Sequence, residues 1–355
     1  MFDKLTNLNR KNSIVVMPDF FVDRIIRLDS QDQLFNMISE KAKYGGGSLR
    51  GIPTFDIKGG NAVNIAYCLA KLGANVTLFT IADEIGSAIL EKIFSKFGDS
   101  VNLRITNGKH GRTTALEFAG GDEKKTSNTT TSKVNLMISD VGDNENFGSE
   151  RIASPDDMEI LKNADAVMVV NWASNLKGTQ LTEHVFKNSP HAFHFIDPAD
   201  IENRKEEFSN ALYKLANMID VLSLNENECN SLGRTLDFDF LLLPSSDYSD
   251  EDIKNAAKKL ADKFAINVEI HTSKGSAWSN GLETAFFPAI KVEVNTLTGA
   301  GDSWDAANIL GYLAGLDAKE RLIFSNAYAS LYVKSPYGEP AIMDDVLQLL
   351  ERIFA

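Results

Sequence analysis

Short apolar runs recur along the chain, separated by segments whose apolar residues follow helical spacing. Runs of this length, bounded by turn residues, are typical of buried strands. Strands that alternate with helices predict βαβ units and a mostly parallel sheet, in which ligands bind beyond the carboxyl ends of the strands. The predicted strands are 14–17, 75–80, 166–170, 192–196, 221–224 and 268–271.

Two of the intervening segments predict helices that end at a glycine. The segment 62–72 repeats its apolar residues at helical spacing and stops at Gly73, and a second such segment, 89–97, stops at Gly98. Glycine is common just past the end of a helix because it adopts the left-handed conformation without strain. We therefore expect both helices to have glycine C-caps.

Two stretches, 20–57 and 110–139, interrupt the alternation, and the second contains the β-rich runs 113–118 and 133–138. We assign both stretches to a small β lid. Three consecutive glycines at 45–47 could form a phosphate-binding nest, but no helical pattern follows them at once, which favours a lid loop. The remaining residues form the predicted α/β core, namely 1–19, 58–109 and 140–355.

Composition excludes several classes of protein. With 43% apolar and 24% charged residues, the chain resembles ordinary soluble proteins, and no apolar run approaches the roughly 18 residues of a membrane span. The first ten residues lack the apolar core of a secretory signal, so we expect a cytoplasmic protein. A net charge of −13 opposes binding to the phosphate backbone of nucleic acids. Cys68 and Cys229 fall in helical patterns, which favours packing over redox chemistry.

The strongest chemical signal is Gly299-Ala300-Gly301-Asp302, which is followed by a helical pattern over 303–314. A glycine turn that opens a helix directs free backbone N–H groups and a positive dipole end at one point, where they can stabilise a phosphoryl group in transfer. Asp302 beside that point could accept a proton from a hydroxyl group. Alternatively, the glycines only form a tight turn and Asp302 caps the helix. The motif alone does not decide between these interpretations.

A second motif, Lys58-Gly59-Gly60-Asn61-Ala62-Val63-Asn64, also stands at the start of a predicted helix. Its glycines permit close approach of the backbone to a ligand, and Asn64 lies one turn into the helix, which suits a polyol. The alternative is that Gly59 and Gly60 merely ease a turn.

In their order and separation, these two motifs resemble the two signatures of the ribokinase (PfkB) family. The resemblance continues through Asp83-Glu84-Ile85-Gly86, Asp197-Pro198 and Asn225-Glu226-Asn227-Glu228, and it covers the chain from about residue 14 to 340. It implies a ribokinase-like α/β fold with a β lid, a sugar or similar hydroxylated acceptor between lid and core, ATP as phosphoryl donor, and Mg²⁺.

The resemblance also implies roles for particular residues. Asp23 matches a residue that binds substrate hydroxyls, and Gly59, Gly60 and Asn64 match the turn that contacts the substrate; Asp23 could instead be an exposed residue of the lid. The Asn-x-x-Glu motif supplies Asn225 and Glu228, which by this resemblance support Mg²⁺ and phosphate. They would act through water, because Mg²⁺ dehydrates reluctantly. The alternative is an Asn225 N-cap followed by solvated glutamates.

The nucleotide site is implied by weaker matches. Thr272 and Gly275 resemble a phosphate-contacting strand end, although that segment is one residue short, and Asn326 falls on a late helix where the family contacts adenine. A solvent-facing polar residue would look the same as Asn326. The family often has an aspartate where this chain has Thr296, three residues before the glycine turn, so activation by a monovalent cation is doubtful.

The predicted function is therefore an ATP-dependent phosphotransferase acting on a hydroxyl of a sugar, nucleoside, inositol or similar polyol, with Asp302 as general base and the amides of 299–301 as anion hole. Two alternatives stay open. The motif at 225–228 also resembles that of ADP-dependent sugar kinases, and a non-catalytic sugar or nucleotide sensor could share the fold. The strand edges of the lid could pair between two subunits in a homodimer.

Overall fold

The computed structural model describes residues 4–5, 12–118, 134–239, 242 and 248–354. The predictions for the remaining residues, including 119–133 of the lid and 1–3 and 6–11 of the core, lie outside the described part of the chain. No helix in these ranges is long and apolar enough to cross a membrane.

The body of the molecule is built on a nine-stranded sheet in the order β13-β12-β11-β10-β9-β8-β1-β4-β5. The strands from β11 to β5 are parallel, and β12 and β13 form an antiparallel edge. All six predicted strands are confirmed, and the prediction missed β5, β12 and β13. The strands are β1 (Ser13–Met17), β4 (Asn75–Ala82), β5 (Val101–Asn107), β8 (Ala166–Val170), β9 (Phe193–Asp197), β10 (Val221–Asn225), β11 (Asn267–His271), β12 (Gly275–Ser279) and β13 (Thr284–Pro288).

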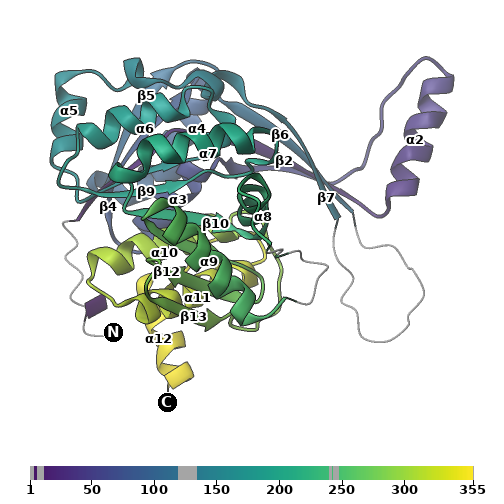
Figure 1. Cartoon of the computed structure of the whole chain (residues 1–355). Coiled ribbons are helices and arrows are strands. Elements are labelled where there is room, and N and C mark those ends of the chain that lie inside the picture. Colours follow the sequence, from purple (N-terminus) through teal and green to yellow (C-terminus); the bar gives the residue numbers. More distant parts are fainter. Residues whose placement is uncertain (1–3, 6–11, 119–133, 240–241, 243–247, 355) are drawn as a thin grey trace.

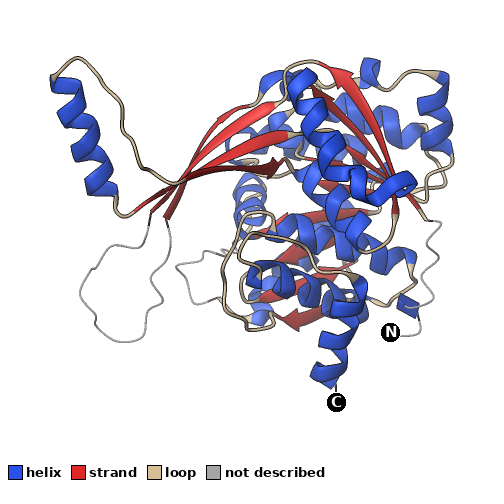
Figure 2. Ribbon diagram, turned by 180° about the vertical axis from the view of Figure 1, so that it is seen from behind, coloured by secondary structure: helices blue, strands red, loops and turns tan. Residues whose placement is uncertain are grey.

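Helices cover both faces of this sheet (Figure 1; Figure 2). One face packs against α5 (Pro155–Lys162), α6 (Gly178–Lys187), α7 (Lys205–Leu215), α8 (Glu226–Thr235) and α9 (Asp250–Phe264). The other packs against α3 (Asn61–Lys71), α4 (Glu84–Phe94), α10 (Ala300–Leu313), α11 (Ala318–Lys334) and α12 (Met343–Phe354).

Successive residues of a strand enter the two different cores. In β1, Val15 belongs to one core while Ile14 and Val16 belong to the other. Burial on both faces explains why strands such as β8 appear in the sequence as continuous apolar runs without alternation.

The two predicted helices differ in how well their ends were placed. The first is α3, and Gly73 just beyond it has the expected positive φ of 91°. The second, α4, begins earlier than predicted and ends at Phe94, and a 3₁₀ turn over Ser95–Ser100 contains Gly98. Gly98 lies inside this 3₁₀ turn, where its φ of 55° interrupts the helical backbone, and it is not the C-cap of α4, which corrects the predicted C-cap.

A second, four-stranded sheet projects from the body in the order β3-β2-β6-β7 (Figure 1). We call it the small sheet. In it β2 and β6 are parallel, and the other neighbours are antiparallel. Its strands are β2 (Phe21–Leu28), β3 (Thr54–Gly59), β6 (Gly111–Phe118) and β7 (Val134–Asp140).

The connection between β2 and β3 contains a helix, α2 (Gln31–Lys43), that the sequence analysis did not predict. The side chain of Ser30 caps it by accepting a hydrogen bond from the Gln33 amide. The helix stands apart from the body (Figure 1), and Phe35 and Ile38 on it are exposed. This helix adds an α element to the segment 20–57, which was assigned to the β lid.

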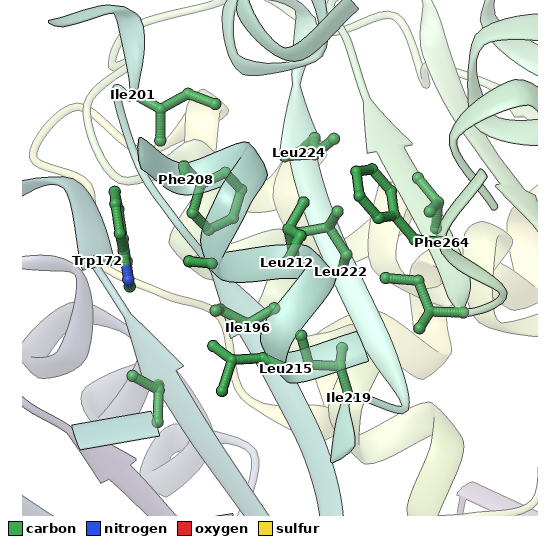
Figure 3. Close-up of a cluster of buried hydrophobic side chains, with 14 of the residues drawn as sticks. Trp172, Ile196, Ile201, Phe208, Leu212, Leu215, Ile219, Leu222, Leu224 and Phe264 are labelled. Carbon is green, nitrogen blue, oxygen red and sulfur yellow. The ribbon is translucent and has the colours of Figure 1, made fainter. Parts of the chain in front are cut away.

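Aromatic and aliphatic side chains fill the space between α7 and the large sheet (Figure 3). Phe208 of α7 is fully buried, and its ring centroid lies 4.9 Å from that of Trp172. Ile196 of β9 and Leu222 of β10 belong to the same cluster. This packing fixes the positions of the strand ends from which the site is built.

Because Phe208 is fully enclosed, Phe208→Ala should lower the free energy of unfolding by about 3–5 kcal/mol. The matched control is Phe35→Ala on α2, where the side chain is 56% exposed and the loss should stay within about 0.5 kcal/mol. Chemical denaturation of both variants measures the difference, and equal losses would contradict the assignment of Phe208 to a packed core.

Candidate active site

The N-terminal turns of α3 and α10 meet beyond the carboxyl ends of the large sheet, and side chains join them. Asp302 of α10 accepts two hydrogen bonds from α3, each 2.9 Å long: Oδ1 from Asn61 Nδ2 and Oδ2 from Asn64 Nδ2. The two motifs that stand some 240 residues apart in the sequence are therefore in direct contact.

Asp302 does not cap its own helix. The N-cap of α10 is Gly299, which has a φ of 86°, and no side chain provides a capping hydrogen bond there. A Cβ atom at Gly299 would lie 2.4 Å from the Tyr332 hydroxyl, so close packing as well as backbone conformation requires glycine. The capping interpretation of Asp302 is thus wrong.

The backbone of this turn can receive an anion, although not through every predicted amide. The Ala300 N–H donates to Leu297 O at 3.1 Å and is already used within the turn. The next two amides, of Gly301 and Asp302, belong to the first turn of α10, where N–H groups have no helical acceptor and the dipole is positive. An anion hole at this point would use these two amides.

Burial gives the Asp302 carboxyl an unusually high proton affinity. Desolvation raises its pKa to about 8, against the hydrogen bond from Asn64, and the nearby carboxylates of Asp197 and Asp19 raise it further. Lys58 opposes them. A general base works best when its pKa is close to the operating pH, which this environment achieves.

Asp23 of β2 faces the same region from the small sheet. Its side chain is buried, and burial raises its pKa to about 6 while Thr113 donates a hydrogen bond that lowers it. Gly59 is its neighbour on β3: a Cβ there would lie 2.2 Å from Asp23 Oδ2. The absence of a side chain at Gly59 makes room for the carboxylate, so Asp23 is not an exposed residue of the insertion.

Asp19, which the sequence analysis did not single out, holds the start of α3. Its carboxylate accepts the backbone amides of Asn61 and Ala62, both at 2.9 Å, and the Asn171 amide group at 2.8 Å. Gly60 has a φ of 93°, and a Cβ there would lie 2.9 Å from Asp19 O. One signal could have found Asp19: it is the first carboxylate beyond the carboxyl end of a predicted strand.

The side chain of Asn225 caps α8 by accepting the amides of Asn227 and Glu228. Asn225 in turn donates to both oxygens of Glu228, from its backbone N at 2.8 Å and from Nδ2 at 2.6 Å. The expected N-cap is therefore present, but Glu228 is buried and not solvated. Burial, and next the charge of Asp197, raises the pKa of Glu228 well above its usual value.

This donor set fits a cation held through water. Within the described ranges, no three His, Cys, Asp or Glu side chains are grouped so as to hold a metal ion by themselves. Asp197 and Glu228 are nonetheless buried carboxyls whose charged forms are disfavoured by desolvation and by each other, and a nearby cation would stabilise those forms. Mg²⁺ keeps several waters and binds through few carboxylates, so these residues suit it.

Comparison with known proteins identifies the family. A sequence profile described as pfkB family carbohydrate kinase matches residues 56–343. The chain belongs to this family. No curated protein sequence matches it.

Solved structures share the ribokinase-like fold over almost the whole chain. Adenosine kinase from Sinorhizobium meliloti superposes with a TM-score of 0.70 at 18% identity, covering 98% of this chain and 100% of that one. Ribokinase from Thermotoga maritima gives 0.69 at 21% identity, covering 96% and 99%. Arabidopsis thaliana ribokinase in complex with ribose and ATP gives 0.68 at 24% identity, again covering 96% and 99%.

Three further residues of this pfkB-family protein were expected at the nucleotide. The Thr272 hydroxyl is used inside the turn between β11 and β12, where it accepts the Lys274 and Gly275 amides and donates to Gly275 O. A Cβ at Gly275 would lie 2.6 Å from the Phe286 ring, so packing alone accounts for this glycine. Contacts from Thr272 and Gly275 to phosphate stay predictions.

Asn326 lies in the interior and does not face solvent. Its Oδ1 accepts the Ser276 hydroxyl and the Trp304 indole N–H, both at 2.8 Å. Its Nδ2 donates to Phe287 O and Pro288 O. The amide thus fastens α11 to α10 and to β13, and the expected adenine contact remains a prediction.

A cavity of about 600 Å³ lies farther out, between the distal part of the small sheet and two core loops. Arg27 and Glu117 line it from the sheet, and Asn295 and Tyr337 from the core. None of the predicted site residues lines this cavity, so it is separate from the reaction centre around Asp302.

The raised pKa of Asp302 makes stability depend on pH. Above about pH 4 the unfolded chain has lost this proton, whereas the folded protein keeps it until about pH 8, so folding stability contributed by Asp302 declines across that window. Asp302→Asn removes the titration. The melting temperature of the variant minus that of the parent should therefore increase from pH 5 to pH 8. A difference that does not change with pH would show that the carboxyl is not buried in this way.

Proposed function

We propose that this protein transfers the γ-phosphoryl group of ATP to a hydroxyl of a sugar, nucleoside or similar polyol, in the cytoplasm. The observation that carries the proposal is the Asp302 carboxyl, which is buried beside the N-terminus of α10 and oriented by Asn61 and Asn64. Proximity of a base to a set of anion-binding amides is what phosphoryl transfer to an alcohol requires.

In the proposed reaction, the acceptor lies between Asp23 on the small sheet and Asn64 on α3, against the turn of Gly59 and Gly60. As the acceptor oxygen attacks the γ-phosphorus atom, its proton passes to Asp302, the bond from that phosphorus to the β,γ-bridging oxygen breaks, and ADP leaves. The amides of Gly301 and Asp302 and the α10 dipole stabilise the negative charge on the phosphoryl group in transfer.

The residues proposed to bind ATP and Mg²⁺ are assigned on fewer contacts than those around the acceptor. Asn225 and Glu228 would hold Mg²⁺ through water, and the ion would neutralise charge on the phosphate oxygens. The expected nucleotide contacts at Thr272, Gly275 and Asn326 belong to this part of the proposal. The ribose and ATP in the Arabidopsis thaliana ribokinase structure support a sugar acceptor and this donor.

We assign the small sheet, with the segments 20–57 and 110–139, to a lid. Asp23 stands on this sheet and Asp302 on the core, so an acceptor that touches both would draw them together and exclude water as a competing acceptor. The edge strand β7 exposes Leu136, Met137 and Ile138, which suits the expected pairing of two lids in a homodimer.

A panel of sugars, nucleosides and inositols tests the function directly. We expect ATP to be consumed only when one class of acceptor is present, with one phosphorylated product formed per ATP. Consumption of ADP in place of ATP would make the protein an ADP-dependent kinase. Thermal stabilisation by a ligand without turnover would make it a sensor, and either result would contradict the proposal.

With the acceptor identified, Asp302→Asn should lower kcat by about 10²- to 10⁴-fold because asparagine cannot take the proton. ATP affinity should change little. The matched control is Asp317→Asn: Asp317 is a true N-cap, of α11, and asparagine caps helices about as well as aspartate, so turnover should be unchanged. If Asp302→Asn keeps more than about a third of parental turnover, Asp302 is not the base.

A further inference from the structure

Lys58 begins the second motif, but neither the motif nor the family resemblance gives it a role. Lys58 is part of β3, immediately before Gly59, and its ammonium donates to Asn64 Oδ1 at 3.0 Å. Asn64 in turn donates from Nδ2 to Asp302 Oδ2 at 2.9 Å. The ammonium also lies 4.6 Å from the centroid of the Tyr67 ring. A continuous chain of hydrogen bonds thus runs from Lys58 through Asn64 to Asp302.

The direction of each of these hydrogen bonds follows from which groups can donate and which can accept. An ammonium group has only donors, so the amide of Asn64 must present its oxygen to Lys58. This orientation leaves the NH₂ end of the amide for Asp302, where it stabilises the ionised carboxylate. Without Lys58, the amide could turn over and present its oxygen to Asp302, which would favour the protonated carboxyl.

Charges around Asp302 give Lys58 a second effect. The carboxyls near Asp302 come from several elements, and in this environment they oppose its ionisation, whereas Lys58 favours it. Burial lowers the pKa of Lys58, and Cys68, Asp302 and Glu339 oppose that decrease. The titratable groups that interact with Asp302 are Lys58 on β3, Asp19 after β1, Asp197 on β9, Glu228 on α8, Asp305 on α10, Tyr332 on α11 and Cys68 on α3.

We propose that Lys58 is the positioning residue of this site: it orients Asn64 and supplies the positive charge that allows Asp302 to ionise among buried carboxyls. This inference rests on the proposed role of Asp302 as the base. Lys58 belongs to β3, a strand of the proposed lid. A movement of the lid would therefore change the contact of Lys58 with Asn64 and, through it, the ionisation of Asp302.

The first test is the pH profile of kcat/KM. An opposite charge a few ångströms away typically lowers the pKa of a carboxyl by about 1–3 units, so Lys58→Met should move the acidic limb upward by about one pH unit or more. Turnover near neutral pH should fall about tenfold for each unit and recover as the pH rises. Lys58→Gln, which keeps a donor for Asn64 without the charge, should move the limb as well, and Lys58→Arg should restore it.

The matched control is Lys96→Met. The Lys96 ammonium also lies 4.6 Å from the Tyr67 ring centroid, but it binds the Tyr67 hydroxyl and Glu339 and not Asn64. A limb that moves only in the Lys58 variants supports the proposal. A shift of equal size in Lys96→Met would show that general loss of positive charge, and not the contact with Asn64, is responsible.

The second test needs no activity. In protein labelled with ¹³C at aspartate carboxyls, the resonance of Asp302 is identified by its loss in Asp302→Asn, and its titration is followed in the ligand-free state. A higher midpoint in Lys58→Met and Lys58→Gln supports the proposal, and an unchanged midpoint in both overturns it. Should the shift occur in a protein that phosphorylates no acceptor, the proposed function fails and the effect of Lys58 on Asp302 stands.

Discussion

The hydrogen bonds from Asn61 and Asn64 to Asp302 join two helix N-termini, and the rest of the site depends on this junction. At α3 the free amides of the first turn are satisfied within the protein, because Asp19 accepts those of Asn61 and Ala62. At α10 no side chain caps the turn. The two positive helix ends therefore differ: one is neutralised by an internal carboxylate, and the other is left for an anionic ligand.

The same region contains several buried carboxyls whose charged forms are disfavoured. Asp302, Asp197 and Glu228 are buried, and desolvation is the largest cause of the raised pKa of each. Burial of this kind lowers stability at neutral pH, and it also gives Asp302 a proton affinity suited to general base catalysis. The net charge of −13 does not oppose the proposed phosphate site, because backbone amides and a helix dipole act locally.

The site is divided between two structural units. Asp302, Asn64 and Glu228 belong to helices packed on the large sheet, whereas Asp23 and Lys58 stand on β2 and β3 of the small sheet. Gly59 and Gly60 join the two units in sequence, and both positions are too crowded for a side chain. An acceptor bound at this boundary, as proposed, would touch both units, so its binding would be coupled to the position of the small sheet.

The sequence alone determined the elements whose evidence is local. Continuous apolar runs identified the buried parallel strands because both faces of the large sheet are covered. The glycine motifs at 59–64 and 299–302 identified the turns that open α3 and α10. The helix α2 was missed although Ser30 and two terminal lysines mark its ends and Leu34 and Ile38 follow helical spacing, because the whole segment 20–57 was assigned to a β lid.

Only the tertiary structure decided what the polar side chains do. Whether Asp302 caps its helix or faces another depended on Asn61 and Asn64, far away in the sequence, and the amide of Asn326 was found to be used in the interior. Lys58 carries no local signal of its role, since that role arises from its contact with Asn64, and the position of Asp19 after a strand does not reveal which amides it accepts. Hydrogen bonding and desolvation depend on which groups meet in space, and the order of residues along the chain does not contain that information directly.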